Sequence, residues 1–241
     1  MEHTKLGSHI SQQFEGELQD IRTRVMTMGG LVEKQLTDAL KALGDINSEL
    51  AEVVVTNDYK INAMEVAIDE ECTQILARRQ PTASDLRLVI AVIKTITDLE
   101  RIGDEAERVA RMAVHFADTG GDSKMLVGIL HLGDMVQTML HGALDAFARM
   151  DTQAAIDVAK ADEKADREYE SILRELITYM MQDPRSIPMV VDVMWSARAL
   201  ERIGDRARNI CEYVIYLVKG KDVRHTSLDK VESDARNKKK Q

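Results

Sequence analysis

Proline and aromatic residues are scarce in this chain, which contains three prolines and only 4% phenylalanine, tryptophan and tyrosine. Proline interrupts helices, and a shortage of aromatic residues disfavours strands. Alanine, leucine, glutamate, lysine, arginine and methionine are abundant instead, and all of them favour helix. The sequence therefore predicts an all-α fold, and its 44% hydrophobic content suffices to bury a sizeable core.

The chain also has few cysteines, no excess of positive charge and no long apolar run. Cys72 and Cys211 form no CxxC or disulfide pattern, so we expect two buried thiols in a reducing compartment. A net charge of −9 argues against non-specific nucleic-acid binding. The N-terminus lacks an apolar signal-peptide region, and the run Leu88–Ile93 is far shorter than the roughly 20 residues that span a bilayer. We expect a soluble, cytoplasmic protein that reaches membranes only through partners.

One pentapeptide, Glu-Arg-Ile-Gly-Asp, occurs at residues 100–104 and again at residues 201–205. This identity indicates an internal duplication with an offset of 101 residues. Earlier in each copy the best offset is 104, so the second copy is three residues shorter near Asp183. At that earlier offset the matching residues of the first copy are Gly29, Val32, Leu36, Ala39, Leu40 and Ala42, and those of the second are Gly133, Val136, Leu140, Ala143, Leu144 and Ala146.

Apolar residues spaced by three or four positions predict three long helices in each copy. In the first copy we predict them at about 11–43, 48–79 and 84–116. In the second copy we predict them at about 124–150, 152–182 and 185–219. Short connections make neighbouring helices antiparallel, so each copy should be an elongated up-down-up bundle. The predicted units are 1–120 and 121–221, followed by a polar tail, 222–241, that we expect to be disordered.

Acidic residues recur at helical spacing in both copies. Glu100 and Asp104 share a helix face, as do Glu201 and Asp205. Carboxylates at this spacing repel, and the glycine between them costs about 1 kcal/mol relative to alanine. A bound cation and room for a close neighbour would explain both costs. Alternatively, the glycine serves helix packing and the acids are a solvated face partly paired with arginines.

The preceding helix of each copy adds a second polar stripe. Asp58 and Asn62 lie on it in the first copy, and Asp162 and Asp166 in the second. If the stripes face each other, several oxygen ligands converge, and such ligands suit magnesium, calcium, manganese or iron. The Glu-xx-His motif of ferritin-like di-iron enzymes is absent from the sequence, as are phosphate-binding loops, nucleophile elbows and HExxH motifs. We therefore predict a protein that is not an enzyme.

A few helix residues have a structural rather than a functional interpretation. We expect His131 and His141 to be packed or half-exposed. Trp195 precedes the second pentapeptide among valines and a methionine, so we expect it in the core rather than at a ligand.

Four features of the chain closely resemble the PhoU family of bacterial phosphate-signalling regulators. They are the repeated helical unit, the twin pentapeptides, the Met-Gly-Gly at Met28–Gly30 and the Gln-Pro-Thr-Ala-Ser-Asp-Leu-Arg at Gln80–Arg87. The resemblance covers nearly the whole chain. It implies two three-helix bundles without known catalysis. It further implies that the protein links the ATPase subunit of a phosphate ABC transporter to the sensor histidine kinase that controls the phosphate-starvation genes. In this role the protein helps to hold the kinase in its repressing state when phosphate is plentiful. We expect the protein to be a homodimer.

The same resemblance implies metal binding, iron included in some members, at the E/DxxxD motifs. The ligand positions carried over to this chain are Asp58, Asn62, Glu100 and Asp104 in the first copy and Asp162, Asp166, Glu201 and Asp205 in the second. Because Asn62 contributes no charge, we predict tighter binding at the second site, which has four formal negative charges against three. Divalent or iron cations are thus expected as ligands, although the regulatory role requires no cofactor. A metal-storage or redox protein is the alternative function.

Overall fold

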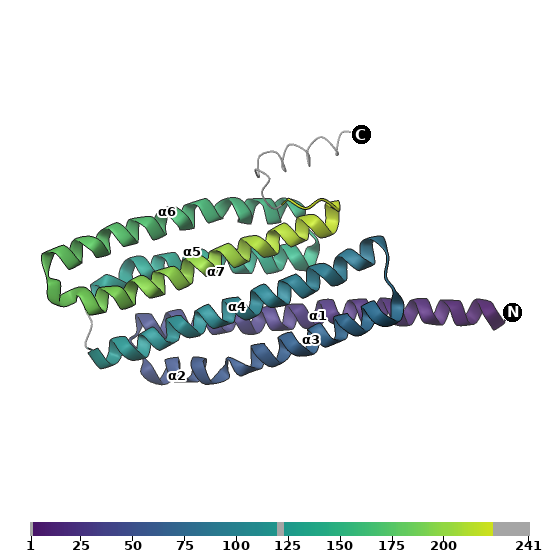
Figure 1. The fold of residues 1–241 in the computed structure, drawn as a ribbon, viewed down its shortest axis with the longest axis horizontal. Coiled ribbons are helices and arrows are strands. Elements are labelled where there is room, and N and C mark those ends of the chain that lie inside the picture. Colours follow the sequence, from purple (N-terminus) through teal and green to yellow (C-terminus); the bar gives the residue numbers. More distant parts are fainter. Residues whose placement is uncertain (1, 120–122, 224–241) are drawn as a thin grey trace.

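The computed structural model describes residues 2–119 and 123–223, and every regular element in these ranges is helical (Figure 1). This arrangement confirms the predicted all-α fold of long helices. The α-helices are α1 (Glu2–Gly44), α2 (Ser48–Asn57), α3 (Tyr59–Arg79), α4 (Ala83–Thr119), α5 (Val127–Arg149), α6 (Thr152–Gln182) and α7 (Ile187–Lys219). Two short 3-10 helices, η1 (Ser123–Leu126) and η2 (Pro184–Ser186), precede α5 and α7.

Most helix boundaries agree with the prediction, but α1 begins at Glu2 rather than at about residue 11. Two further differences have local causes. The predicted second helix is divided at Asp58 into α2 and α3, although Asp58 keeps helical dihedral angles. The last predicted helix starts with the separate turn η2, which has a proline at its first position. Proline fits the first turn of a helix because the N–H group it lacks has no partner there. The side chain of Asn47 accepts a hydrogen bond from the backbone N–H of Leu50 and so caps α2.

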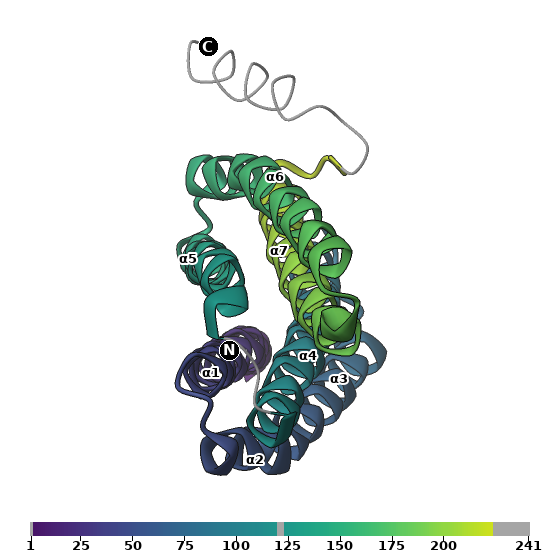
Figure 2. The ribbon, with the colours of Figure 1, turned by 90° about the vertical axis from the view of Figure 1, so that its left-hand side faces the viewer.

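The two repeats lie side by side and share one continuous apolar core (Figures 1 and 2). In the end-on view, α1, α4, α5 and α7 form the middle of the molecule, with α2 and α3 at one side and α6 at the other. Helices α1 and α5 pack together, and so do α4 and α7. The predicted division at residue 120 and nearly all of the predicted tail, 224–241, lie outside the described residues.

A reciprocal contact between α1 and α5 reflects the duplication. A Cβ atom on Gly29 would lie 2.7 Å from a Cδ atom of Leu144, and one on Gly133 would lie 2.4 Å from a Cδ atom of Leu40. Leu40 and Leu144 are equivalent at the offset of 104, as are the two glycines. Each repeat therefore inserts the same leucine above the same glycine of the other repeat. The glycines are required here for the close approach of the two helices.

Two buried acids connect α4 to α7. Asp98 is 4% exposed; it accepts a hydrogen bond of 2.8 Å from the hydroxyl of Tyr213 and one of 3.2 Å from Arg206. Farther along the same contact, Glu105 accepts a hydrogen bond of 3.1 Å from Arg202. These partners show that α4 and α7 run antiparallel, because the residue number rises on one helix as it falls on the other.

Both cysteines are fully buried, as predicted, and burial raises the pKa of each thiol to about 12. Among the described residues, no helix combines the length and the apolar content that crossing a membrane requires.

Candidate functional site

The glycine of each pentapeptide lets an aspartate of the neighbouring helix approach closely. A Cβ atom on Gly103 would lie 3.4 Å from Oδ1 of Asp58. In the second repeat, a Cβ atom on Gly204 would lie 3.5 Å from Oδ1 of Asp162. Both aspartates are buried, at 7% and 3% exposed. The two pentapeptides thus occupy equivalent surroundings, and each brings the acids of two helices together.

In the first repeat, neutral amides hold Asp58 in place. Its Oδ1 accepts a hydrogen bond of 2.8 Å from Nε2 of Gln35, and its Oδ2 accepts one of 3.0 Å from Nδ2 of Asn62. Gln35 lies on α1 and also donates to the backbone carbonyl of Gly103 at 3.2 Å. Because neither amide carries charge, the negative charge of Asp58 is not neutralised by these contacts.

Asp58, Asp104 and Glu107 form the tightest acidic group of the first repeat. Each offers a carboxylate oxygen, and these oxygens all lie within 4.8 Å of one another. Burial, followed by the neighbouring charge of Asp58, raises the pKa of Asp104. Burial, followed by the charge of Asp104, raises the pKa of Glu100. Carboxylate oxygens at such distances are chemically suited to a hard cation, so the residues present fit the divalent metal that the resemblance implies. Glu107 also pairs with Arg111 on the same helix.

In the second repeat, an arginine already occupies the corresponding place. Nη1 of Arg208 lies 3.1 Å from Oδ2 of Asp162, and its Nε lies 3.4 Å from Oε1 of Glu212. At the offset of 101, Arg208 replaces Glu107. At the offset of 104, Met139 replaces Gln35. The second repeat has therefore exchanged a carboxylate for a guanidinium and an amide for an apolar side chain.

The remaining acids of the second repeat still repel one another. Burial raises the pKa of Asp162 to about 6, although the hydrogen bond from Arg208 opposes this increase. Burial, and then the charge of Asp205, raises the pKa of both Asp166 and Glu201. Arg198 also donates to Glu201 at 2.7 Å.

From these contacts we propose the opposite order of affinity to the one predicted from formal charge. At the offset of 101, the pair of Glu107 with Arg111 in the first repeat corresponds to the pair of Arg208 with Glu212 in the second, so the two charges have exchanged places. Arg208 also uses one oxygen of Asp162 that a metal would need. We therefore propose the first repeat as the better cation site. Gln35, Glu107 and Arg208 are missing from the predicted ligand set; aligning the two repeats at their offsets would have shown the exchange.

The expectation for Trp195 is wrong. Its side chain is 65% exposed, because it lies on the opposite side of α7 from the buried Val193 and Ala197. His131 and His141 are also exposed rather than packed, and Nδ1 of His141 lies 2.8 Å from Glu33 on α1.

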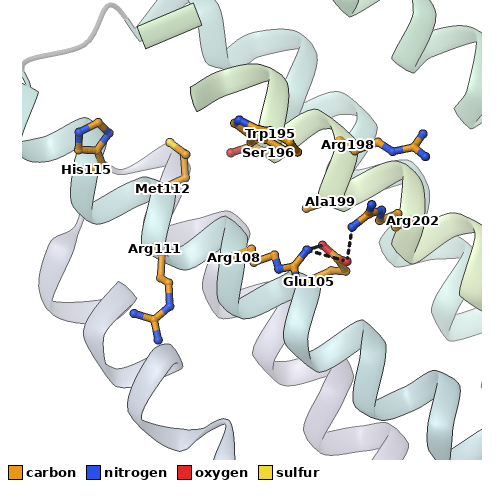
Figure 3. Close-up of a pocket in the computed structure, with 10 residues that line it drawn as sticks. All are labelled: Glu105, Arg108, Arg111, Met112, His115, Trp195, Ser196, Arg198, Ala199 and Arg202. Atoms are coloured by element: carbon orange, nitrogen blue, oxygen red, sulfur yellow. Dashed lines mark hydrogen bonds and ion pairs between the residues drawn. The ribbon is translucent and has the colours of Figure 1, made fainter. Parts of the chain in front are cut away.

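Trp195 lines a groove of about 380 Å³ between α4 and α7 (Figure 3). Met112 and His115 from α4 lie on one side of it, and Trp195 and Ala199 from α7 on the other. At one end, Arg108 and Arg202 approach Glu105 from the two helices.

Comparisons with known proteins agree with this description. The PhoU domain matches residues 25–113 and again residues 129–214. The phosphate-specific transport system accessory protein PhoU of Escherichia coli is 51% identical over 233 residues, which is 96% of each chain. The crystal structure of PhoU from Pseudomonas aeruginosa has a TM-score of 0.84 and 55% identity, covering 86% of this chain and 100% of that one. The phosphate transport system regulatory protein PhoU from Streptococcus pneumoniae has a TM-score of 0.80 and 32% identity, covering 87% of this chain and 99% of that one.

Fold and site together define a class of all-α protein in which a three-helix unit is duplicated and each copy carries a buried carboxylate cluster beside a helical glycine. The chain belongs to the PhoU domain family.

Proposed function

We propose that the protein is a non-enzymatic accessory and regulatory protein of phosphate transport. In this proposal it couples the ATPase subunit of a phosphate ABC transporter to the sensor histidine kinase of the phosphate response. It acts on the cytoplasmic side of the membrane and represses the phosphate-starvation genes when phosphate is plentiful.

The observation that carries the proposal is identity along nearly the whole chain. Relatives that are 51% and 55% identical over 96% of their length are named as accessory proteins of the phosphate-specific transport system. A more distant relative of known structure is named as a regulatory protein of phosphate transport. At such identity and coverage, both repeats and the contact between them are shared, so a shared role is the simplest interpretation.

Within this role, we propose that the first repeat binds a divalent cation through Asp58, Asp104 and Glu107. Their clustered oxygens support the proposal, as does the raised pKa of Asp104. A bound cation would supply positive charge that neutralises the acids of α3 and α4 and so stabilises their contact. Gln35 and Asn62 orient the carboxylate of Asp58 from either side.

Deleting the gene and measuring alkaline phosphatase in phosphate-rich medium tests the regulatory role. The proposal predicts constitutive alkaline phosphatase in the deletion strain, restored to repression by a plasmid copy. Unchanged repression together with altered cellular manganese or iron would instead support the storage or redox function, which the carboxylate cluster also favours.

A further inference from the structure

The groove beside Trp195 is lined by different side chains from those at the equivalent place of the other repeat. At the offset of 101, Trp195 corresponds to Lys94, Met112 to Tyr213 and His115 to Tyr216. At that equivalent place, Nζ of Lys94 lies 5.4 Å and 5.7 Å from the ring centroids of the two tyrosines. Tyr213 is anchored there by its hydrogen bond to Asp98. Two tyrosines covered by a lysine thus occupy one copy of the surface, whereas Trp195, Met112 and His115 line a groove at the other.

The apolar part of this surface continues along α7. Ile187, Val191 and Trp195 are spaced by four residues, so they share one face of the helix. They are 42%, 39% and 65% exposed. A row of large apolar side chains at this spacing is the arrangement that an amphipathic helix of a partner contacts with its own apolar face. From Ile187 to Arg202 the row measures about 22 Å, or four helical turns.

Charge at the other end of the groove specifies the partner further. Arg108 and Arg202 both pair with the carboxylate of Glu105. Glu105 lies beneath them: its side chain is 11% exposed, against 59% for Arg108 and 40% for Arg202. The groove therefore presents guanidinium groups to the outside although the chain as a whole carries a net charge of −9.

We propose that the groove between α4 and α7 is a docking site for an acidic amphipathic helix of a partner protein. The apolar face of that helix contacts Trp195 and Val191, and its acidic residues contact Arg108 and Arg202. The role of this groove in the cell rests on the proposed adaptor function, because an adaptor needs a docking site. Binding of an acidic helix to the groove in vitro can be tested without that function.

Trp195 is the single tryptophan of the chain, so its fluorescence reports on this groove alone. The probe is a synthetic, tryptophan-free helical peptide of about 20 residues, with leucines along one face and glutamates along the other. A second peptide has every glutamate replaced by lysine. At about 0.1 M salt the acidic peptide is expected to shift the Trp195 emission to shorter wavelength, while the basic peptide leaves it unchanged.

Three variants locate the binding, measured as anisotropy of the fluorescein-labelled acidic peptide. Arg108→Gln combined with Arg202→Gln is expected to weaken binding about tenfold or more, and Trp195→Ala similarly. The matched control combines Arg24→Gln with Arg174→Gln, and it should bind the peptide like the parent. Arg24 is 39% exposed and, like Arg174, is in an ion pair. Because Trp195 is mostly exposed, its replacement tests the groove even if the double arginine variant fails to fold.

Several outcomes would overturn the proposal: equal binding of both peptides, peptide binding without a change in Trp195 emission, or equal weakening in the control. A blue shift that depends on protein concentration alone would assign the groove to a second copy of this chain. A further test compares a gene deletion with the Trp195→Ala and arginine variants in cells. If the deletion makes alkaline phosphatase constitutive while these variants repress it fully, the docking site is rejected and the adaptor function is retained.

Discussion

At the scale of single residues, the two repeats have diverged at a few positions that determine their chemistry. Glu107 and Arg208 are equivalent positions with opposite charge. In the first repeat Asp58 accepts hydrogen bonds from two neutral amides and Glu107 pairs with Arg111, whereas in the second repeat Arg208 pairs with Asp162. The same ancestral cluster has thus become a candidate cation site in one repeat and an internal ion pair in the other.

Replacing Arg208 with methionine should expose this difference as a pH-dependent loss of stability. Asp162 would remain buried without its ion pair, and we expect a cost of about 2 kcal/mol at pH 8, reduced from the value for a fully buried pair because Arg208 is partly exposed. In a protein of this size that cost lowers Tm by roughly 4–8 °C.

The sign of the pH dependence follows from the raised pKa of Asp162. Its folded-state pKa of about 6 lies above the ordinary 3.8, so ionised Asp162 destabilises the fold above pH 6, and protonation removes the penalty as the pH falls toward 3.8. The deficit of Arg208→Met relative to the parent should therefore shrink between pH 8 and pH 5. Thermal unfolding in EDTA at both pH values measures it, and a deficit that does not change with pH would show that Arg208 acts only through packing.

At the scale of helices, the contact between α1 and α5 depends on glycines that admit leucines. Gly133→Ala places a Cβ atom against Leu40, and we expect a net loss of about 1 kcal/mol, because overpacking outweighs the gain in helix propensity. Gly30→Ala is the matched control on α1, since nothing lies within 4 Å of its added Cβ atom. The control should stabilise the protein by up to about 1 kcal/mol. Urea unfolding compares them, and equal stabilisation by both changes would contradict the close contact.

The sequence predicts the helices well but not their exposed faces. Spacing alone locates α6 and most of α4, because long apolar rows are unambiguous. It does not predict the division at Asp58, where the dihedral angles stay helical. The prediction for Trp195 failed because it rested on the apolar residues next to it in sequence, such as Val193 and Met194. Asp192 and Arg198, three residues before and after it, lie on its own face of the helix and mark that face as polar. Ligand positions are predictable within one helix, whereas Gln35 comes from a third helix and requires the packing.

At the scale of the whole molecule, one core joins the two repeats, and their surfaces differ. Helices α4 and α7 are the centre of this arrangement, because they carry both pentapeptides, the ion pairs between the repeats and the groove beside Trp195 (Figures 1 and 3). Duplication supplied two equivalent clusters and two equivalent surfaces. In each pair, Arg208 or Tyr213 and Tyr216 occupy one copy, and we propose that the other copy binds a ligand.

Titration of manganese into the chelator-treated protein by calorimetry tests this asymmetry most directly. The structure predicts one site per chain, with affinity reduced at least about tenfold by Asp104→Asn and nearly unchanged by Asp205→Asn. Arg208→Glu, which restores the acid found at the equivalent Glu107, should add a second site. A larger loss from Asp205→Asn than from Asp104→Asn, or two equal sites in the parent, would contradict the account.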